Sequence, residues 1–369
     1  MKVRLGEVIQ LNPREQLPKG KVAKKIAMDN LKPFSREIAG YEMGAYNGGT
    51  KFRNEDTLLA RITPCLENGK TAYVNILDSE EVAFGSTEYF VLRAKKELID
   101  PLYLYYLSIS NDFRNVAIKS MTGTSGRQRA QKEAILNYEF DLPSLSDQRK
   151  IAHIIGCLDD KKVLNNRIND NLDALLTTIF NDHMERASFE EASLTDIATY
   201  KNGLAMQKYR PENHKQSLPV LKIKELNQGH TDDSSDRCSA HIDESVIVHT
   251  GDIIFSWSGT LLVKNWSGRT AGLNQHLFKV TSKHYPDWFI YEWTKHHLCK
   301  FQAIASGKAT TMGHIKRSDL KSSQVLIPNK NELDMLDAKM NPFYNQRIEL
   351  IKENQRLVDL KQTLLQKYF

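Results

Sequence analysis

The sequence predicts an α+β protein in which two duplicated globular domains are joined by two long helices. The helices are expected to pack as an antiparallel coiled coil, with a pseudo-two-fold relation between the halves. Three observations lead to this prediction: a heptad pattern in the middle of the chain, segments that recur 185 residues apart, and a second heptad pattern at the C-terminal end. A chain of 369 residues is also too long for one ordinary core, which favours several domains.

The central long helix is expected over residues 147–184. Heptads counted from residue 151 place the following side chains at the a and d positions: Ile151, Ile154, Leu158, Lys161, Asn165, Ile168, Leu172, Leu175, Ile179 and Asp182. Seven of these ten are aliphatic, which is typical of a coiled-coil seam. Ser146 is expected to cap the helix, with Asp147 near its positive end. A single buried helix fits this pattern equally well, and a similar pattern at the C-terminus favours a helix pair.

An internal repeat relates the two halves of the chain. The matching segments are Pro101–Leu107 with Pro286–Trp293, Leu142-Pro143 with Ile327-Pro328, Glu55–Arg61 with Thr250–Ser256, and Leu175–Phe180 with Leu364–Phe369. A repeat of this length indicates a duplicated domain, because solenoid repeats are much shorter. We therefore divide the chain into a first domain (1–142), a central helix (143–186), a second domain (187–328) and a distal helix (329–369).

Within each domain, short strands separated by Gly, Asn and Pro indicate a curved, mostly β sheet. Expected strands include Lys70–Ile76, Glu88–Arg93, Val246–His249 and His276–Val280. Each domain then has one expected helix, at 101–118 or 286–305. A Gly/Ser/Thr loop, a short helix and a last strand ending at a proline follow it.

The distal helix is expected in two parts, a short helix at 331–340 and a main helix from Pro342 to the end. Asn329 and Glu332 resemble a capping box, and Pro342 suits a first helical position better than a helix interior. Apolar pairs then recur every seven residues: Phe343-Tyr344, Leu350-Ile351, Leu357-Val358 and Leu364-Leu365. Such a stripe needs a partner, and the helix at 147–184 is the natural one.

Charge is concentrated on the two domains. The net charge is +6, with a pI of about 8.9. Residues 1–142 carry 21 basic and 18 acidic side chains, and residues 187–328 carry 17 and 14, whereas the helical segments sum to zero. This excess permits an acidic partner on each domain, although a solvated surface would explain it too.

The cysteines and the absence of long apolar segments indicate the cell compartment. The cysteines Cys65, Cys157, Cys238 and Cys299 are far apart and include no Cys-x-x-Cys, which fits a reduced cytoplasmic protein without structural zinc. The first residues lack an apolar leader, and no run of about 18 apolar residues occurs, so we expect no secretion and no membrane span.

The stretch Leu-Pro-Ser-Leu-Ser-Asp-Gln-Arg-Lys-Ile-Ala at 142–152, the duplication and the helix after each copy resemble the specificity subunit of type I restriction–modification enzymes. The loop from Met121 to Gln128 also resembles the family pattern. The resemblance covers essentially the whole chain. The second copy departs from the signature, because Asn329-Lys330-Asn331-Glu332 replaces the Ser-Leu-Ser-Asp-Gln run.

This resemblance implies a noncatalytic DNA-binding subunit, monomeric within its complex. Each domain would read one half of a bipartite double-stranded target. The helices would set the spacing and dock two methyltransferase subunits, and two restriction (motor) subunits would complete the assembly. The chain itself would hold no cofactor, because S-adenosylmethionine and ATP would bind the partner subunits.

Candidate DNA contacts lie in two pairs of loops that combine basic, hydroxyl and aromatic side chains. In the first domain they are Arg61, Lys70, Thr122, Thr124, Ser125, Arg127, Gln128 and Arg129. In the second they are Trp257, Lys264, Arg269, Lys308, Thr310, Thr311, His314 and Lys316. Exposed connecting loops, and core positions for Trp257 and Trp266, are the competing interpretations. The helix residues expected to form the seam and docking surface are Ile151, Ile154, Leu158, Ile168, Leu172, Leu175, Phe343, Leu350, Leu357 and Leu364.

Catalytic alternatives have little support in the sequence. Asn341-Pro342-Phe343-Tyr344 is superficially similar to the Asn-Pro-Pro-Tyr/Phe motif of adenine methyltransferases, but it lacks the second proline and a Gly-rich S-adenosylmethionine loop. No Gly-x-x-x-x-Gly-Lys-Ser/Thr phosphate loop occurs. His296-His297 fit a solvated helix face better than a metal site. The remaining alternative is a tandem DNA-binding protein, such as a regulator or a restriction decoy, that acts without methyltransferase partners.

Overall fold

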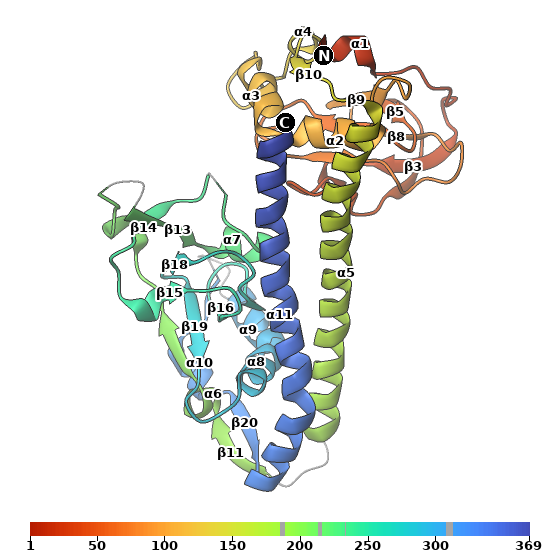
Figure 1. Cartoon of the computed structure of the whole chain (residues 1–369). Coiled ribbons are helices and arrows are strands. Elements are labelled where there is room, and N and C mark those ends of the chain that lie inside the picture. Colours follow the sequence, from red (N-terminus) through yellow and green to blue (C-terminus); the bar gives the residue numbers. More distant parts are fainter. Residues whose placement is uncertain (185–188, 213–215, 233, 308–312) are drawn as a thin grey trace. The chain divides into compact units, whose positions relative to one another are not determined.

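The computed structural model describes residues 1–184, 189–212, 216–232, 234–307 and 313–369 (Figure 1). The chain divides into two compact units. The first contains residues 1–161 and 359–369, and the second contains residues 162–358. Each unit therefore includes one β-rich region together with parts of both long helices, and we describe each unit by itself.

The first unit is built on two four-stranded sheets. The first sheet has the order β2-β9-β6-β7, and the second has the order β4-β3-β8-β5. Neighbouring strands are antiparallel except for β3 and β8. The strands are β2 (Ile9–Leu11), β3 (Val22–Ile26), β4 (Glu42–Ala45), β5 (Thr50–Phe52), β6 (Thr57–Ala60), β7 (Thr71–Tyr73), β8 (Ala83–Gly85) and β9 (Tyr89–Ala94). A separate pair joins β1 (Lys2–Arg4) to β10 (Glu139–Asp141).

The second unit repeats this arrangement. Its sheets have the orders β12-β19-β16-β17 and β14-β13-β18-β15, and only β13 and β18 pair in parallel. The strands are β12 (Thr199–Asn202), β13 (Ser217–Leu221), β14 (Arg237–Ser239), β15 (Ile247–Val248), β16 (Ile253–Ser256), β17 (Leu262–Asn265), β18 (Ala271–Leu273) and β19 (Leu277–Thr281). The pair β11 (Phe189–Ser193) and β20 (Gln324–Pro328) corresponds to β1 and β10. The duplication thus extends to sheet order and strand direction.

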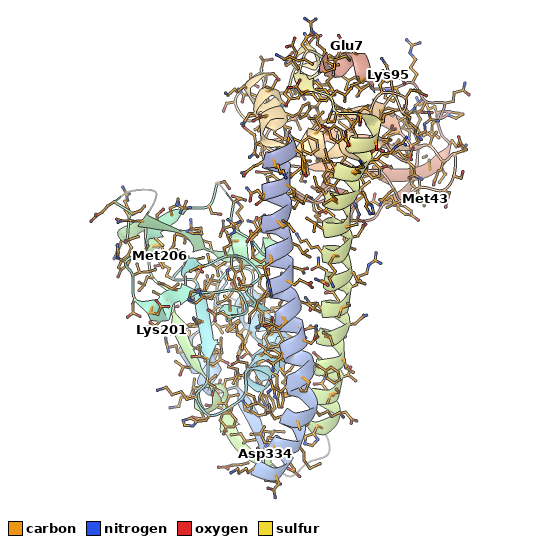
Figure 2. The ribbon with its side chains drawn as sticks, viewed as in Figure 1. Glu7, Met43, Lys95, Lys201, Met206 and Asp334 are labelled. Carbon is orange, nitrogen blue, oxygen red and sulfur yellow. The ribbon has the colours of Figure 1, made fainter. Side chains whose placement is uncertain are left out.

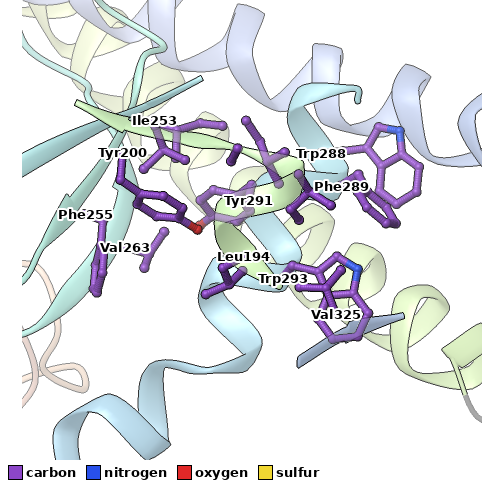
Figure 3. Close-up of a cluster of buried hydrophobic side chains, with 14 of the residues drawn as sticks. Leu194, Tyr200, Ile253, Phe255, Val263, Trp288, Phe289, Tyr291, Trp293 and Val325 are labelled. Atoms are coloured by element: carbon purple, nitrogen blue, oxygen red, sulfur yellow. The ribbon is translucent and has the colours of Figure 1, made fainter. Parts of the chain in front are cut away.

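Side chains differ in exposure between the sheet edges and the cores (Figure 2). Met43 on the edge strand β4 and Lys201 on the edge strand β12 are exposed, whereas Met206 is buried in a second-unit core. The largest second-unit cluster combines aromatic side chains of the helix after β19 with strand residues such as Tyr200 and Phe255 (Figure 3). Leu176 and Tyr344 of the two long helices belong to the same cluster, so the helices complete this core.

The helices are short in both β-rich regions. The first unit has α1 (Leu5–Val8), η1 (Met28–Asn30), α2 (Pro101–Ile109), α3 (Asn111–Lys119) and α4 (Lys132–Leu136). The second has α6 (Leu194–Ile197), η2 (Met206–Lys208), α7 (Ile223–Gln228), η4 (Glu244–Val246), α8 (Asp287–His296), α9 (Leu298–Ser306) and α10 (Arg317–Lys321). The predicted order of helix, loop, short helix and last strand is confirmed in the first region, and in the second the predicted loop lies partly outside the described residues.

The prediction of one helix at 101–118 and one at 286–305 was wrong, because each is two helices. Ser110 has an extended backbone (ψ 153°) between α2 and α3, and its hydroxyl donates to the Leu107 carbonyl at 2.8 Å. His297 separates α8 from α9, with its Nε2 2.8 Å from the Gln324 carbonyl oxygen. A short polar side chain that binds the preceding turn, and an imidazole tied to the last strand, stop helices that the apolar pattern alone would continue.

The long helices α5 (Leu145–Met184) and α11 (Lys330–Tyr368) pack together. In the second unit, the Asn165 amide donates to the Asn354 side chain at 3.0 Å, and Asp173 lies 3.3 Å from Arg347. Later residues of one helix therefore meet earlier residues of the other, which makes the pair antiparallel. The predicted α+β fold of two similar β-sheet domains with two packed helices is confirmed.

Two predicted helix boundaries were wrong. Ser144, not Ser146, caps α5, because its hydroxyl accepts the Asp147 N–H at 3.2 Å and donates to the Asp147 carboxylate at 2.7 Å. The break predicted before Pro342 is absent, since α11 is continuous through that residue. Pro342 loses one backbone hydrogen bond, but Met340 and Tyr344 on either side are buried in the same core and hold the helix together.

The a/d pattern predicted for the helix seam is only partly correct. Ile151 and Leu350 are buried, and Leu158, Ile168, Leu172, Leu357 and Leu364 are half-buried. Ile154 and Leu175 are 47 % and 41 % exposed, and Phe343 is 36 % exposed. Ile155, Leu176 and Phe180 are buried instead. A helix that packs against a β-rich region as well as a partner helix buries a wider and rotated stripe than a two-helix seam does.

The signature stretch at 142–152 has a structural role. Gln148 is fully buried, and its amide Oε1 accepts the Asp100 N–H at 2.9 Å. Its Nε2 donates to the carbonyl oxygens of Leu98 and Pro143 at 3.1 and 2.9 Å. This glutamine therefore fixes the start of α5 to the chain segment that begins α2.

Candidate nucleic-acid interface

The loop between α3 and α4 of the first unit is a closed turn rather than an open connection. Thr122 and Arg129 exchange both backbone hydrogen bonds, at 2.9 and 3.1 Å. Gly123 and Gly126 have positive φ values of 128° and 78°, which suit a tight turn. The turn exposes Thr124, Ser125 and Arg127, as expected for residues that contact a ligand. The Thr122 hydroxyl accepts a hydrogen bond from Gln131 at 2.7 Å.

This turn is joined to the loop after β6, where Arg61 lies. Ile62 and Arg129 form an isolated antiparallel bridge, and the Gln128 carbonyl accepts the Thr63 N–H at 3.0 Å. Two of the predicted DNA-contact loops therefore meet in space. Lys70 belongs to the same loop region but is 17 % exposed, and its ammonium group donates to the Met28 carbonyl at 3.0 Å. The structure gives Lys70 a role within the domain.

Glu88 lies between the two predicted arginines. It accepts three hydrogen bonds of 2.7 to 3.1 Å from the Nε and Nη2 of Arg129, and it is 3.8 Å from the Nε of Arg61. The Arg61 guanidinium also covers the Phe90 ring at 4.9 Å. The hydrogen bonds from Arg129 hold the pKa of Glu88 below its ordinary value, so this carboxylate stays charged at neutral pH. We call Arg61, Glu88 and Arg129 the first cluster.

The second unit has a corresponding group, formed by Trp257, His276 and His314, which we call the second cluster. Ser258 and His314 form the isolated bridge that corresponds to Ile62 and Arg129. The Trp257 ring lies 5.8 Å from His276, 5.8 Å from Phe278 and 6.3 Å from His314 between centroids. Trp257 is half-buried, and its indole N–H donates to Asn202 at 3.1 Å. This hydrogen bond fixes the orientation of the ring.

The other second-domain candidates do not all join this cluster. Lys264 and Arg269 are exposed, and Lys264 donates to the Asn227 carbonyl at 3.2 Å. Lys316 is exposed at the start of α10. Trp266 is fully buried, which confirms the core interpretation for that residue. Lys308, Thr310 and Thr311 lie outside the described residues.

Sequence reasoning missed Glu88 and His276. Each is the first residue of an expected strand, and the two lie 188 positions apart. The signal that could have found them was the repeat itself, because equivalent strands begin with different polar residues beside the predicted contact loops.

Among the residues that the structure describes, other kinds of site have little support. In the parts of the chain that the structure describes, no group of three or more His, Cys, Asp and Glu side chains is placed to hold a metal ion. Among the same residues, no helix combines the length and the apolar character needed to cross a bilayer. The Asn341–Tyr344 stretch lies inside α11, where the Tyr344 hydroxyl accepts a hydrogen bond from Asn265 at 2.8 Å.

Comparison with known proteins shows the family. The family model described as "Type I restriction modification DNA specificity domain" matches residues 1–174 and 187–361. The chain is 34 % identical over 104 residues to the Escherichia coli type I restriction enzyme EcoAI specificity subunit, which is 28 % of this chain and 18 % of that protein. It is 23 % identical over 305 residues to the MjaIX specificity subunit of Methanocaldococcus jannaschii, covering 72 % and 67 % of the two chains.

The fold comparison agrees. The crystal structure of the type I restriction–modification S subunit from M. genitalium matches with a TM-score of 0.53 at 14 % identity, covering 100 % of this chain and 96 % of that one. The aligned segment spans less than a fifth of the length of the EcoAI subunit. Because the family model matches both halves of the chain, the chain belongs to the family of type I restriction–modification specificity subunits, which are noncatalytic components.

Proposed function

We propose that this chain is the sequence-specific DNA-binding subunit of a type I restriction–modification complex. Residues 1–142 and 187–328 would each read one half of a bipartite double-stranded target. The observation that carries this proposal is the duplication of one fold with chemically different side chains at the joined loops. A tandem reader needs the same scaffold twice and different contacts on each copy.

The charge of each domain supports this assignment. Both carry a net charge of +3, which favours phosphate contacts, and the loops beside the clusters expose hydroxyl and guanidinium groups such as Ser125 and Arg127. Phosphate contacts would orient each domain on the duplex, and side chains of the clusters would contact base edges. The spacing of the two half-sites would follow from the packed helices.

The outer faces of the helices support docking of two methyltransferase subunits. Ile154, Leu164 and Leu175 of α5 are each more than 40 % exposed, as is Leu360 of α11. Exposed aliphatic side chains on charged helices favour a protein partner. In this assembly the chain would be monomeric, two restriction subunits would join, and S-adenosylmethionine and ATP would bind the partner subunits.

The separation of spacing from base reading can be tested in the assembled complex. Because α5 and α11 pair side by side near Asn165 and Asn354, one heptad should be inserted in both helices at this level. Each helix then lengthens by about 10.5 Å, which corresponds to about three base pairs at most. Methylome sequencing should show an unspecified gap longer by about one to three base pairs with unchanged half-sites.

Two comparisons sharpen this test. Replacing residues 1–142 with another recognition domain should change one half-site and leave the gap unchanged. A heptad inserted in α5 alone shifts the pairing with α11 and should weaken folding instead. Altered bases after the double insertion, or an altered gap after the domain replacement, would contradict the proposal.

Partner docking has a separate measurement. Native mass spectrometry of the chain mixed with its methyltransferase should give a complex with two methyltransferase subunits per chain. No association in that mixture, with DNA binding retained by the chain alone, would favour a stand-alone DNA-binding protein.

A further inference from the structure

Strand register establishes which residues of the two domains are equivalent, without any sequence comparison. On β6 and β9, Leu59 lies opposite Phe90. On β16 and β19, Phe255 lies opposite Phe278. Counting two residues outward from these pairs equates Arg61 with Trp257 and Glu88 with His276.

The third member of each cluster is fixed by the isolated bridges. Arg129 lies opposite Ile62, three residues after Leu59, and His314 lies opposite Ser258, three residues after Phe255. Arg129 and His314 are therefore equivalent as well. The two clusters occupy one place in a duplicated fold.

The chemistry of this place differs between the domains at all three positions. A phenylalanine, Phe90 or Phe278, forms the base of both clusters. Arg61 covers Phe90, and the first cluster adds a carboxylate and a second guanidinium group. The second cluster has an indole and two imidazoles, and Arg317, outside the cluster, also covers Phe278 at 5.6 Å. Conservation of the scaffold with replacement of the whole cluster is the pattern expected where two copies contact different ligands.

The Arg129 side chain is held for contact with a base. A guanidinium group has five N–H donors. Glu88 takes the Nε donor and one Nη2 donor, at distances of 2.7 to 3.1 Å, and the Arg127 carbonyl lies 3.4 Å from Nη1. The end of the fork, formed by Nη1 and Nη2, retains further donors, and the side chain is 40 % exposed.

The end of an arginine fork matches the two acceptors, O6 and N7, that guanine presents in the major groove. A carboxylate that fixes the opposite edge reduces the rotational freedom lost on binding. We propose that Arg129, positioned by Glu88, contacts a guanine in the half-site of the first domain. The cluster positions are then the ones that make the two half-sites differ.

The second cluster cannot make this contact. The indole N–H of Trp257 donates to Asn202, and Trp257, His276 and His314 carry no guanidinium group. The Arg317 guanidinium of α10 covers the Phe278 ring at 5.6 Å, but its Nη2 donates to the Tyr200 carbonyl at 3.3 Å. The second cluster offers ring faces, which suit stacking or contact with a thymine methyl group. The corresponding position of the second half-site should therefore lack a guanine contacted by an arginine fork.

This inference rests on the proposed function, and its test separates the two. Methylome sequencing should be performed for the complex with the wild-type chain and with Arg129→Lys, Arg129→Gln and Glu88→Gln. We expect the Arg129 variants to lose discrimination at one guanine of the first half-site by about 5- to 150-fold. Glu88→Gln should reduce the preference for the same guanine to a smaller extent. The second half-site should stay unchanged in all three.

A matched control and a folding measurement make the outcomes unambiguous. Arg53 lies in the same domain, is 46 % exposed and pairs with Glu15 at 3.4 Å, so Arg53→Lys should leave every base preference unchanged. His314→Ala should alter the second half-site alone. Thermal unfolding of each variant identifies loss of methylation that is caused by misfolding, and base preferences are compared among the variants that fold.

Unchanged base preference in Arg129→Gln, or equal loss of methylation at every site with no relaxed position, would overturn the guanine contact. A wild-type complex that methylates no bipartite motif would instead refute the proposed function. Relaxation at the same guanine by Arg129→Lys and Glu88→Gln supports the positioning role of Glu88, since a purely structural effect would not select one base.

Discussion

Each unit contains an ion pair between its parts of α5 and α11, and the two units differ in the number of cations paired with the acid. In the first unit, the Lys361 ammonium of α11 donates to both carboxylate oxygens of Asp159 of α5 at 2.7 and 2.8 Å. The Tyr106 hydroxyl donates to the same carboxylate at 2.9 Å. Both charged side chains are only 12 to 13 % exposed.

The second unit has a larger network. Asp173 of α5 lies 3.3 Å from Arg347 of α11 and accepts a hydrogen bond from Lys295 of α8 at 2.6 Å. Tyr291, the equivalent of Tyr106, receives a 2.9 Å hydrogen bond from Arg347. Asp173 thus has two cations, whereas Lys361 is the one cation paired with Asp159 among the described residues. In both units α5 supplies the acid and α11 the base. This charge complementarity favours pairing of α5 with α11 over pairing of two identical helices.

The largest effect is expected for Lys361→Met. It leaves the Asp159 carboxylate buried without its cation, which costs about 3–5 kcal/mol of folding free energy. Thermal unfolding, together with faster hydrogen exchange in α2, measures this loss. Adding Asp159→Leu should restore most of the stability, because removing both charges is nearly neutral. An equal loss in the single and double variants would contradict the ion-pair explanation.

A matched control lies on the same helix. Lys352 pairs with Glu349 at 2.8 Å, but both side chains are more than 40 % exposed. Lys352→Met should change stability by less than about 1 kcal/mol, since water screens an exposed pair.

The next effect is specific to the second unit and depends on pH. Glu292 is 1 % exposed, and one of its carboxylate oxygens has no hydrogen-bond partner. Burial raises its pKa from an ordinary 4.5 to about 7. The folded state therefore binds this proton more tightly than the unfolded chain, and stability falls as the pH rises from about 4.5 through 7.

Glu292→Gln should remove this dependence. At pH 8 the variant should be more stable than the wild type by about 1–3 kcal/mol, and near pH 4.5 the difference should largely disappear. Unfolding curves at several pH values provide the measurement. A difference that stays constant across this range would show that ionisation of Glu292 does not contribute.

The smallest effect tests the redundancy directly. Lys295→Met leaves Asp173 with Arg347, and the lysine and aspartate side chains are 27 % and 29 % exposed. We expect a loss of about 1 kcal/mol, well below that of Lys361→Met. Equal losses for the two lysines, compared by denaturant unfolding under one condition, would show that the networks are not different in strength.

The periodic and repeated features were predictable from the sequence because they depend on local pattern. Heptads from Ile151 predicted α5, and segments offset by 185 residues predicted two similar domains before any coordinates were known. The candidate loops around Arg61 and Arg129 were predicted from composition, and these two do lie together. Their partner Glu88 was not predicted, because its contact depends on strand pairing between residues far apart in the chain.

The sequence by itself determined the fold class, the duplication and the pairing of two long helices, since hydrophobic periodicity reports burial along one element. Tertiary structure decided which face of each helix is buried, so that Ile155 and Leu176 lie inside while Ile154 and Leu175 are exposed. It also decided that α11 continues through Pro342, because packing of its neighbours offsets a lost backbone bond. The local sequence pattern does not predict the two clusters either. Each cluster combines residues from three separate segments, and the pairing of strands in the sheet brings these segments together.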